Sequence, residues 1–238
     1  MKTPQIPSDS TVGVVIVGAG KGLRMGGLDK IFSTIRGVPV IAHSLRTFAV
    51  LPEVHCIALV LSEERLRDGR RLATAFGMGK VAGICLGGER RQDSVRAGLE
   101  ALGACDWVVV HDGARPLVDR EMVLRGLNAA TETGAAVCAV PAKDTIKVVS
   151  EDGAVQDTPP RDTLWHVQTP QVFRYETLLR AHEQCSGDFN DDAAMVESLG
   201  ITVKVFMGSY RNVKVTTPED LAVVETLLTR AKTKTVSP

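Results

Sequence analysis

Short apolar runs alternate with segments of helical period from Val14 to Pro141, and this alternation limits the folds open to the chain. The runs are rich in β-branched residues, as in strands buried on both faces, and they cover 14–17, 56–61, 81–86, 107–111 and 135–141. The intervening segments have the apolar spacing of helices packed on a core, and they cover 39–48, 63–76, 93–102 and 119–133. Such alternation predicts an α/β fold with a mostly parallel sheet and helices on both faces. Ligands gather at the carboxyl ends of the strands in sheets of this kind.

A glycine-rich loop, residues 18–22, directly follows the first predicted strand, and the cations Arg24 and Lys30 lie downstream of it. Glycines there let the backbone turn sharply and present its N–H groups to phosphate. The loop lacks the glycine spacing and the ribose-binding acid of a dinucleotide fold, and no Gly-Lys-Ser completes a Walker A loop. We interpret it as a nucleotidyltransferase loop around a triphosphate, with Lys30 at the reacting phosphorus. The alternative is a tight turn with cations exposed to solvent.

Two more loops follow predicted strands and carry polar residues. In the loop 87–94, the backbone and the Ser94 hydroxyl could read a nucleotide base, or Ser94 could cap the following helix. In the loop 111–116, Asp112 could face a ribose or the hydration shell of a metal ion, and Arg115 could contact an anion. The alternative for this second loop is a surface ion pair between Asp112 and Arg115.

The alternation stops after Pro141, where the sequence predicts a hairpin with strands at 145–149 and 154–157 around an Asp-Gly turn. A lone two-stranded hairpin is marginal in water, so we expect this arm, residues 143–161, to pack on a second copy of the chain and form a homodimer. Helices are predicted at 175–184 and 191–199, a strand at 203–207, and a last helix capped by Thr217-Pro218-Glu219-Asp220. We interpret residues 1–238 as one domain, with residues 1–10 as a frayed tail.

Composition excludes several classes of function. Lys and Arg together number 28, as do Asp and Glu, so the net charge is zero and favours neither a nucleic-acid-binding nor a membrane-binding surface. No apolar run approaches the roughly 18 residues of a membrane span, and no signal-peptide pattern is present. The five cysteines lack a C-x-x-C pair, which favours reduced thiols in a cytoplasmic protein. The histidines lack metal-ligand spacing, so we assign no structural metal.

Seven motifs in a fixed order give the chain a resemblance to a known family. They read VGAGKGLRM with a following K, GGERRQDSV, VVVHDGARP, AVPAKDTIK, RDTLWHVQTPQVF, NDDA and NVKVTTPEDL. Together they resemble the 2-C-methyl-D-erythritol 4-phosphate cytidylyltransferases of non-mevalonate isoprenoid biosynthesis, which join CTP to a methylerythritol phosphate. The resemblance implies a Rossmann-like nucleotidyltransferase fold and a homodimer. It also implies a Mg²⁺ ion held mainly by the CTP phosphates, with Asp112 as the candidate for its outer hydration shell.

The resemblance also implies roles for particular residues. The nucleotide-binding candidates that it implies are Ala19, Gly20, Gly88, Glu89, Ser94, Asp112 and Gly113, and the glycine-rich loop adds Gly18 and Gly22. The catalytic candidates, Arg24 and Lys30, would stabilise the transition state. The residues expected to position the sugar phosphate are Thr145, Arg161, Thr169 and Lys214, joined by Arg115, and the partner's arm is expected to supply Thr145 and Arg161. Glu89, Gly113 and Asn190 differ from the usual family residues, and the segment from Arg24 to Lys30 is one residue short, but no cation is lost.

The expected reaction needs no protein base. A phosphate monoester has its second pKa near 6, so at neutral pH it is largely dianionic and can attack the α-phosphorus of CTP directly. Mg²⁺ and fixed cations then stabilise the developing charge. Two alternatives remain. One is a cytidylyltransferase for another polyol phosphate, such as ribitol 5-phosphate, because such enzymes share most of the CTP loops. The other is a non-catalytic nucleotide-binding protein, which would not require Arg161 and Lys214.

Overall fold

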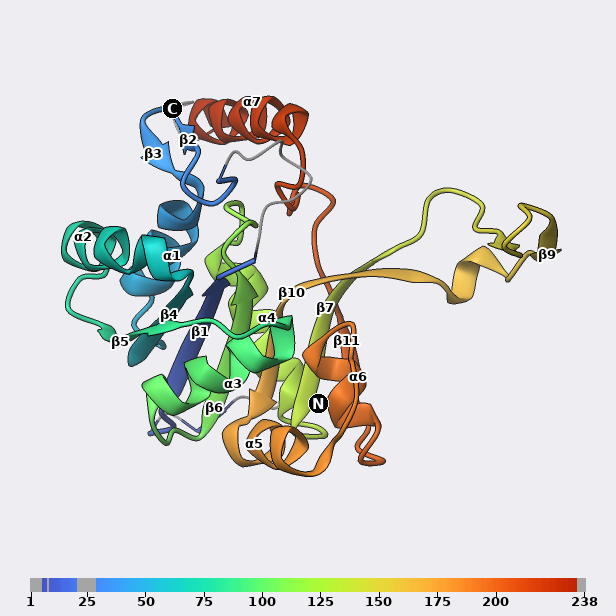
Figure 1. Cartoon of the computed structure of the whole chain (residues 1–238), viewed down its shortest axis with the longest axis horizontal. Helices are drawn as coiled ribbons and strands as arrows, with labels where there is room; N and C mark the ends of the chain where they lie inside the picture. Colours follow the sequence, from blue (N-terminus) through green and yellow to red (C-terminus); the bar gives the residue numbers. More distant parts are fainter. Residues whose placement is uncertain (1–5, 8, 21–28, 235–238) are drawn as a thin grey trace.

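The computed structural model of the chain describes residues 6–7, 9–20 and 29–234, and Figure 1 shows a twisted central sheet with one long projection. From one edge to the other, the seven strands are β11 (Lys204–Met207), β7 (Ala135–Pro141), β10 (Trp165–Arg174), β6 (Trp107–Asp112), β1 (Val12–Gly18), β4 (Cys56–Leu61) and β5 (Val81–Leu86). Only β10 pairs antiparallel with its neighbours in this sheet, and the other pairs are parallel. The mostly parallel sheet predicted from the alternation is confirmed.

Helices cover both faces of the sheet, as predicted. On one face lie α1 (Val40–Val50), α2 (Leu66–Phe76) after the short 3₁₀ helix η2 (Glu63–Arg65), and α4 (Arg120–Ala130). On the other face lie α3 (Arg91–Leu102), α5 (Tyr175–Gln184) and α6 (Asp192–Glu197). Along β1, Val14 and Ile16 enter the first core whereas Val15 enters the second, and all three are fully buried. The strand reads as a continuous apolar run because both of its faces are covered.

The last helix, α7 (Pro218–Lys234), packs over a small hairpin of β2 (Thr34–Ile35) and β3 (Val38–Pro39). The predicted cap is confirmed, since the Thr217 N–H donates to the Asp220 carboxylate at 2.8 Å. The structure describes no helix that is both long and apolar enough to cross a bilayer.

Strand β10 is the main element that the sequence pattern does not predict. Pro170 interrupts it, and a proline cannot donate to a sheet ladder, so the segment does not have the pattern of a central strand. The ladder with β7 shifts register between Val167 and Gln171, which lets Pro170 lie in an irregularity of the strand. The missed strand matters for function, because β10 brings Thr169 into the centre of the sheet beside β6.

Several predicted boundaries are corrected by a few residues. Helix α3 begins at Arg91 rather than at Asp93, because the Asp93 carboxylate accepts the Arg90 N–H at 3.1 Å and closes the start of the helix. Helix α6 is shorter than 191–199, and α4 ends before 133.

The predicted arm is present, and it extends away from the sheet (Figure 1). Its strands β8 (Val148–Val149) and β9 (Val155–Asp157) pair antiparallel, and the first is shorter than the predicted 145–149. The 3₁₀ helix η3 (Arg161–Thr163) follows before β10 begins. Every residue of β8 and β9 is exposed, including their three valines. An apolar hairpin without a core of its own is the observation on which the dimer prediction depends.

Candidate active site

A cavity of about 350 Å³ opens at the carboxyl ends of β1 and β6, beside the loop that follows β5. Most of the predicted nucleotide-binding residues, together with two of the predicted cations, line it: Gly18, Ala19, Gly20, Gly88, Glu89, Ser94, Asp112, Lys30 and Lys214. The lining also includes Ile31, Arg90 and Arg91. Three loops far apart in the sequence therefore meet at one edge of the sheet, as expected for an α/β ligand site.

Two predicted residues, Gly22 and Arg24, lie outside the described residues. Gly113 is described, but it does not line the cavity. Its N–H donates to the Val17 carbonyl at 2.8 Å, and a side chain there would begin 3.0 Å from Ile41. In this structure Gly113 therefore has a packing role between β1, β6 and α1.

The loop after β5 is shaped by Ser94. The Ser94 hydroxyl accepts the Gly88 N–H at 3.1 Å and donates to the Arg90 carbonyl at 3.2 Å. A β-carbon at Gly87 would lie 2.1 Å from the Cβ of Ala19, so only glycine lets this loop approach the first glycine loop. Since Asp93 closes the helix start, Ser94 is not the cap; it fixes the backbone that forms the cavity wall.

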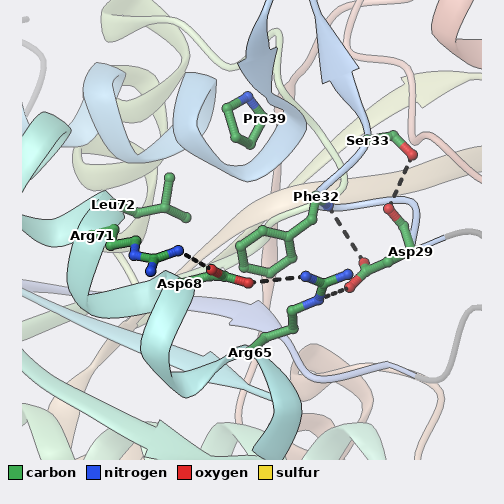
Figure 2. Close-up of a pocket in the computed structure, with 8 residues that line it drawn as sticks. All are labelled: Asp29, Phe32, Ser33, Pro39, Arg65, Asp68, Arg71 and Leu72. Carbon is green, nitrogen blue, oxygen red and sulfur yellow. Dashed lines mark hydrogen bonds and ion pairs between the residues drawn. The ribbon is translucent and has the colours of Figure 1, made fainter.

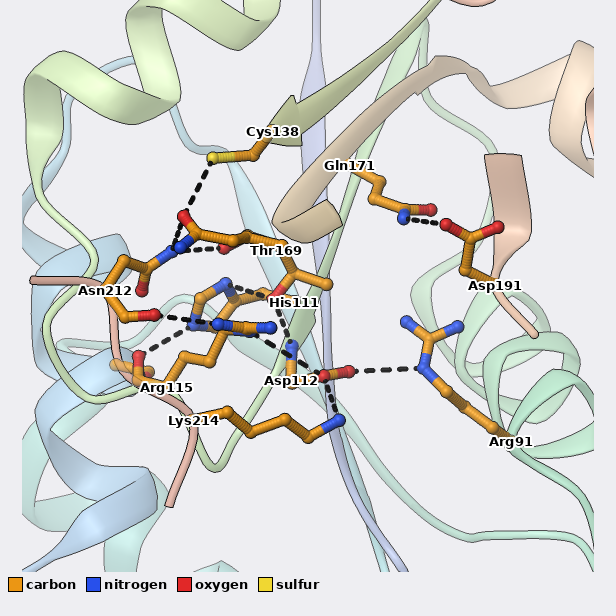
Figure 3. Close-up of polar contacts among 12 residues, drawn as sticks. Arg91, His111, Asp112, Arg115, Cys138, Thr169, Gln171, Asp191, Asn212 and Lys214 are labelled. Carbon is orange, nitrogen blue, oxygen red and sulfur yellow. Dashed lines mark hydrogen bonds and ion pairs between the residues drawn. The ribbon is translucent and has the colours of Figure 1, made fainter. Parts of the chain in front are cut away.

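Asp112 is the centre of the charge arrangement (Figure 3). Its carboxylate lies 3.2 Å from Arg91 Nε and 2.6 Å from Lys214 Nζ, with Arg115 Nε at 4.0 Å. Burial alone would raise the pKa of Asp112, but the positive charges of Arg91 and Lys214 outweigh burial and hold the pKa well below its usual range. Asp112 is therefore ionised, and it fixes the two cations at the cavity wall.

Arg91 is a site residue that the sequence interpretation did not single out. Its Nη1 lies 2.6 Å from Asp192 Oδ2, and the Asp192 side chain is fully buried. Arg91 thus joins β6 to the start of α6, so that one guanidinium is held between two carboxylates. Its motif, GGERRQDSV, and the NDDA motif of Asp192 are visible in the sequence, but their pairing depends on the tertiary fold.

A second cavity of about 220 Å³ adjoins the first and shares Arg91, Asp112 and Lys214 with it. Its other lining residues are Arg115, Val167, Gln168, Thr169, Gln171, Asn190 and Asp191. Three of the residues predicted to position the sugar phosphate, Arg115, Thr169 and Lys214, therefore meet here. Thr145 and Arg161 lie on the arm and do not line this cavity of their own chain.

Buried hydrogen bonds hold Thr169 against β6 (Figure 3). The Thr169 hydroxyl accepts the Asp112 N–H at 3.0 Å and contacts His111 Nδ1 at 3.2 Å, while His111 Nε2 contacts the Arg115 carbonyl at 3.0 Å. A carbonyl can only accept, so Nε2 carries the proton and Nδ1 accepts from the Thr169 hydroxyl. Burial lowers the pKa of His111 to about 4, so the imidazole ring stays neutral at physiological pH.

The burial of His111 leads to a prediction about stability in acid. Its pKa of about 4 in the folded chain lies below the ordinary 6.5, so the unfolded chain takes up the proton first as the pH falls. Stability is therefore lost from about pH 6.5 down to about pH 4, by up to about 3 kcal/mol from this group. We expect the melting temperature to fall across this window, and the fall to be shallower in His111→Gln. The lowered pKa values of His43 and His182 add to the wild-type slope, so the difference between the two proteins is the measurement. Parallel slopes would contradict the prediction.

The described residues contain no cluster of three or more His, Cys, Asp or Glu side chains that could hold a metal. Asp112, the candidate for the outer shell of Mg²⁺, has both oxygens occupied by cations, Oδ1 by Arg91 and Oδ2 by Lys214. These residues do not fit direct metal coordination.

A mostly parallel α/β sheet that places a glycine loop and paired cations at its carboxyl edge defines an enzyme acting on nucleotide phosphates. The sequence model of the family described as 2-C-methyl-D-erythritol 4-phosphate cytidylyltransferase matches residues 12–230. A relative of that name from Dehalococcoides mccartyi is 50% identical over 221 residues, covering 93% of this chain and 97% of the relative. Another, from Alkaliphilus metalliredigens, is 44% identical over 231 residues, covering 94% and 95%.

Solved structures agree. The 4-diphosphocytidyl-2C-methyl-D-erythritol synthase from Anaerococcus prevotii superposes with a TM-score of 0.82 at 29% identity, covering 92% of this chain and 99% of that one. The chain belongs to the 2-C-methyl-D-erythritol 4-phosphate cytidylyltransferase family. It is thus a CTP-dependent cytidylyltransferase of isoprenoid precursor biosynthesis, as the resemblance of its motifs implied.

Proposed function

We propose that the larger cavity holds CTP and the smaller one holds 2-C-methyl-D-erythritol 4-phosphate, so that the two reactants meet at their shared wall. The observation that carries this proposal is the wall itself, made of Arg91, Asp112 and Lys214. Two anions must approach each other in this reaction, and cations at the boundary can lower the repulsion between them. The products are 4-diphosphocytidyl-2-C-methyl-D-erythritol and pyrophosphate.

Within this arrangement the described residues have separate roles. The glycine loop, residues 18–20, lies where its backbone can approach the triphosphate, and Lys30 lines the same cavity. Lys214 and Arg115 line the smaller cavity, where they neutralise and align the phosphate of the sugar. The phosphate dianion attacks the α-phosphorus, the bond from that phosphorus to the bridging oxygen breaks, and pyrophosphate leaves with the electron pair. Because the attacking group is already ionised, no side chain has to remove a proton.

We propose that Mg²⁺ enters with CTP and is held by the triphosphate. The ion would supply neutralising charge at the phosphates when bound. The engagement of both Asp112 oxygens with cations supports a minor part for this residue toward the metal, at most through water. Asp112 instead holds the Arg91 guanidinium and the Lys214 ammonium in place.

We propose further that the active unit is a homodimer in which the partner's arm supplies Thr145 and Arg161. The exposed valines of β8 and β9 support this proposal, because a second copy would cover them. A cytoplasmic location is proposed from the five free cysteines, which suit a reducing compartment.

Pyrophosphate release tests the assignment of both substrates. We expect turnover with CTP and 2-C-methyl-D-erythritol 4-phosphate, and little with ATP or GTP, because a pocket built around a pyrimidine at Gly88, Glu89 and Ser94 would exclude the larger purine ring. Ribitol 5-phosphate serves as the competing acceptor under the same conditions. Faster turnover with ribitol 5-phosphate would show that the acceptor substrate is this polyol phosphate instead. Equal rates with ATP and CTP would contradict the base assignment, and CTP binding without any turnover would favour the non-catalytic alternative.

A further inference from the structure

Lys30 lies in a turn that is fixed on both sides. The Asp29 carboxylate accepts the N–H groups of Ile31 and Phe32 at 3.2 and 3.4 Å, and the Asp29 carbonyl accepts the Ser33 N–H at 2.8 Å. On the other side, Ile31 is only 4% exposed and belongs to the main core. The Ile31 carbonyl also accepts the Ile41 N–H at 3.0 Å. The position of the Lys30 backbone is therefore set by its two neighbours.

The Asp29 side of this turn is held by a residue distant in the sequence. Arg65, the last residue of η2, places Nε 2.7 Å from Asp29 Oδ2 and Nη1 2.9 Å from Asp68 Oδ2 (Figure 2). Its guanidinium also lies 4.7 Å from the centre of the Phe32 ring, a cation–π contact. The Arg65 guanidinium thus forms ion pairs with both the turn and helix α2, and a lysine ammonium could not reproduce this two-sided geometry.

Asp29, Phe32, Arg65 and Asp68 line a third cavity, of about 470 Å³, together with Ser33, Pro39, Arg71 and Leu72. The charged side chains of this cavity pair with one another, because Arg65 bridges Asp29 and Asp68, and Arg71 lies 3.4 Å from Asp68. Asp29 and Asp68 are only about 30% exposed, so these pairs are partly shielded from water. Because these charges already pair with one another, we interpret the cluster as a support for the turn and not as a separate ligand site.

We propose that Arg65 is a positioning residue for the cytidylyl transfer, acting through Asp29 to hold Lys30 at the nucleotide cavity. This inference rests on the proposed role of Lys30 in the transition state. Displacement of a stabilising group by about 1 Å can cost up to about 100-fold in rate. A charge at the α-phosphorus works only when it is already in place as the transition state forms. The Arg65–Asp29 pair supplies that placement from outside the cavity.

A double-mutant cycle between Arg65 and Lys30 tests the proposal. Arg65→Met keeps an unbranched side chain of similar reach and removes the guanidinium with its ion pairs and its contact with Phe32. We expect kcat to fall by about 10- to 100-fold with an unchanged KM for CTP. In the Lys30→Ala background the same change should have no further effect on kcat, because the group that it positions is already gone. Arg65→Lys should recover part of the lost kcat, since one ammonium can still pair with Asp29.

Arg71→Met is the matched control, because Arg71 lines the same cavity and pairs with Asp68, but its side chain is 84% exposed and no contact joins it to Asp29. It should leave kcat unchanged. Folding of every variant is checked by its melting temperature. If Arg65→Met fails to fold, Asp29→Asn takes its place in the cycle, because asparagine can still cap the turn while the ion pair is lost. A smaller fall in kcat, absent in the Lys30→Ala background, is then expected.

The outcomes separate this inference from the proposed function. Additive losses in the cycle, or a native kcat in Arg65→Met, would overturn the positioning role while leaving the role of Lys30 intact. A native kcat in Lys30→Ala would instead remove the proposed function of Lys30, and the positioning role with it.

Discussion

Replacing Lys30 with alanine is expected to lower kcat by about 100- to 1,000-fold, the usual cost of losing one stabiliser of transition-state charge. Lys30 lines the nucleotide cavity beside the glycine loop, where its ammonium can meet charge that develops at the α-phosphorus. An interaction made only in the transition state changes kcat and leaves binding of the ground state nearly unchanged. CTP affinity, measured by calorimetry on the folded variant, should therefore stay close to that of the wild type.

Two other lysine variants serve as controls for Lys30→Ala. Lys204→Ala removes an ammonium that pairs with Glu132 at 2.9 Å on the edge strand β11, outside both cavities, and it should leave the kinetics unchanged. Lys214→Ala should mainly raise KM for the sugar phosphate, with some loss of kcat because alignment also suffers. A near-native kcat in Lys30→Ala would reduce Lys30 to a simple binding contact.

The sequence predicted best those parts of the fold that depend on local pattern. The strands β4, β5 and β7 begin and end at the predicted residues, because runs buried on both faces are marked off by polar turns. Strand β10 was missed because Pro170 contradicts the local pattern of a strand, and pairing on both sides with β6 and β7 overrides that pattern. Only tertiary structure shows that this segment lies in the middle of the sheet.

The same division applies to the site. The glycines and cations of the loops could be selected from the sequence because phosphate chemistry requires those residue types after strands. Arg91, Asp192 and Arg65 could not be selected in that way, since each matters through a partner far along the chain. Arg91 pairs with Asp112 and Asp192, and Arg65 pairs with Asp29. A charged residue in a helix is usually exposed to solvent. The local sequence around these three residues does not show that each pairs with a distant residue instead.

Removing the arm, residues 143–161, should abolish turnover of the sugar phosphate while CTP binding persists. The two ends of the arm lie side by side, because the Ala142 N–H donates to the Leu164 carbonyl at 2.9 Å, so a short glycine linker can close the gap. Both cavities keep all of their own lining residues in this variant. Light scattering should report a monomer, since the exposed apolar hairpin is the proposed dimer contact. A deletion variant that stays dimeric or keeps full activity would contradict the arm's role.

A mixture of two impaired chains gives the sharper test of whether the arm works across the dimer. Arg161→Ala damages the arm, and Lys30→Ala damages the nucleotide cavity, so each homodimer contains two defective sites. In a mixed dimer, the chain with an intact Lys30 receives the partner's intact arm, which restores one complete site. Random assembly makes about half of the dimers mixed, so activity should return to about a quarter of the wild-type level when measured below the KM for the sugar phosphate. If the arm served its own chain instead, no mixed dimer would contain an intact site, and the activity of the mixture would not exceed the average of the two separate variants.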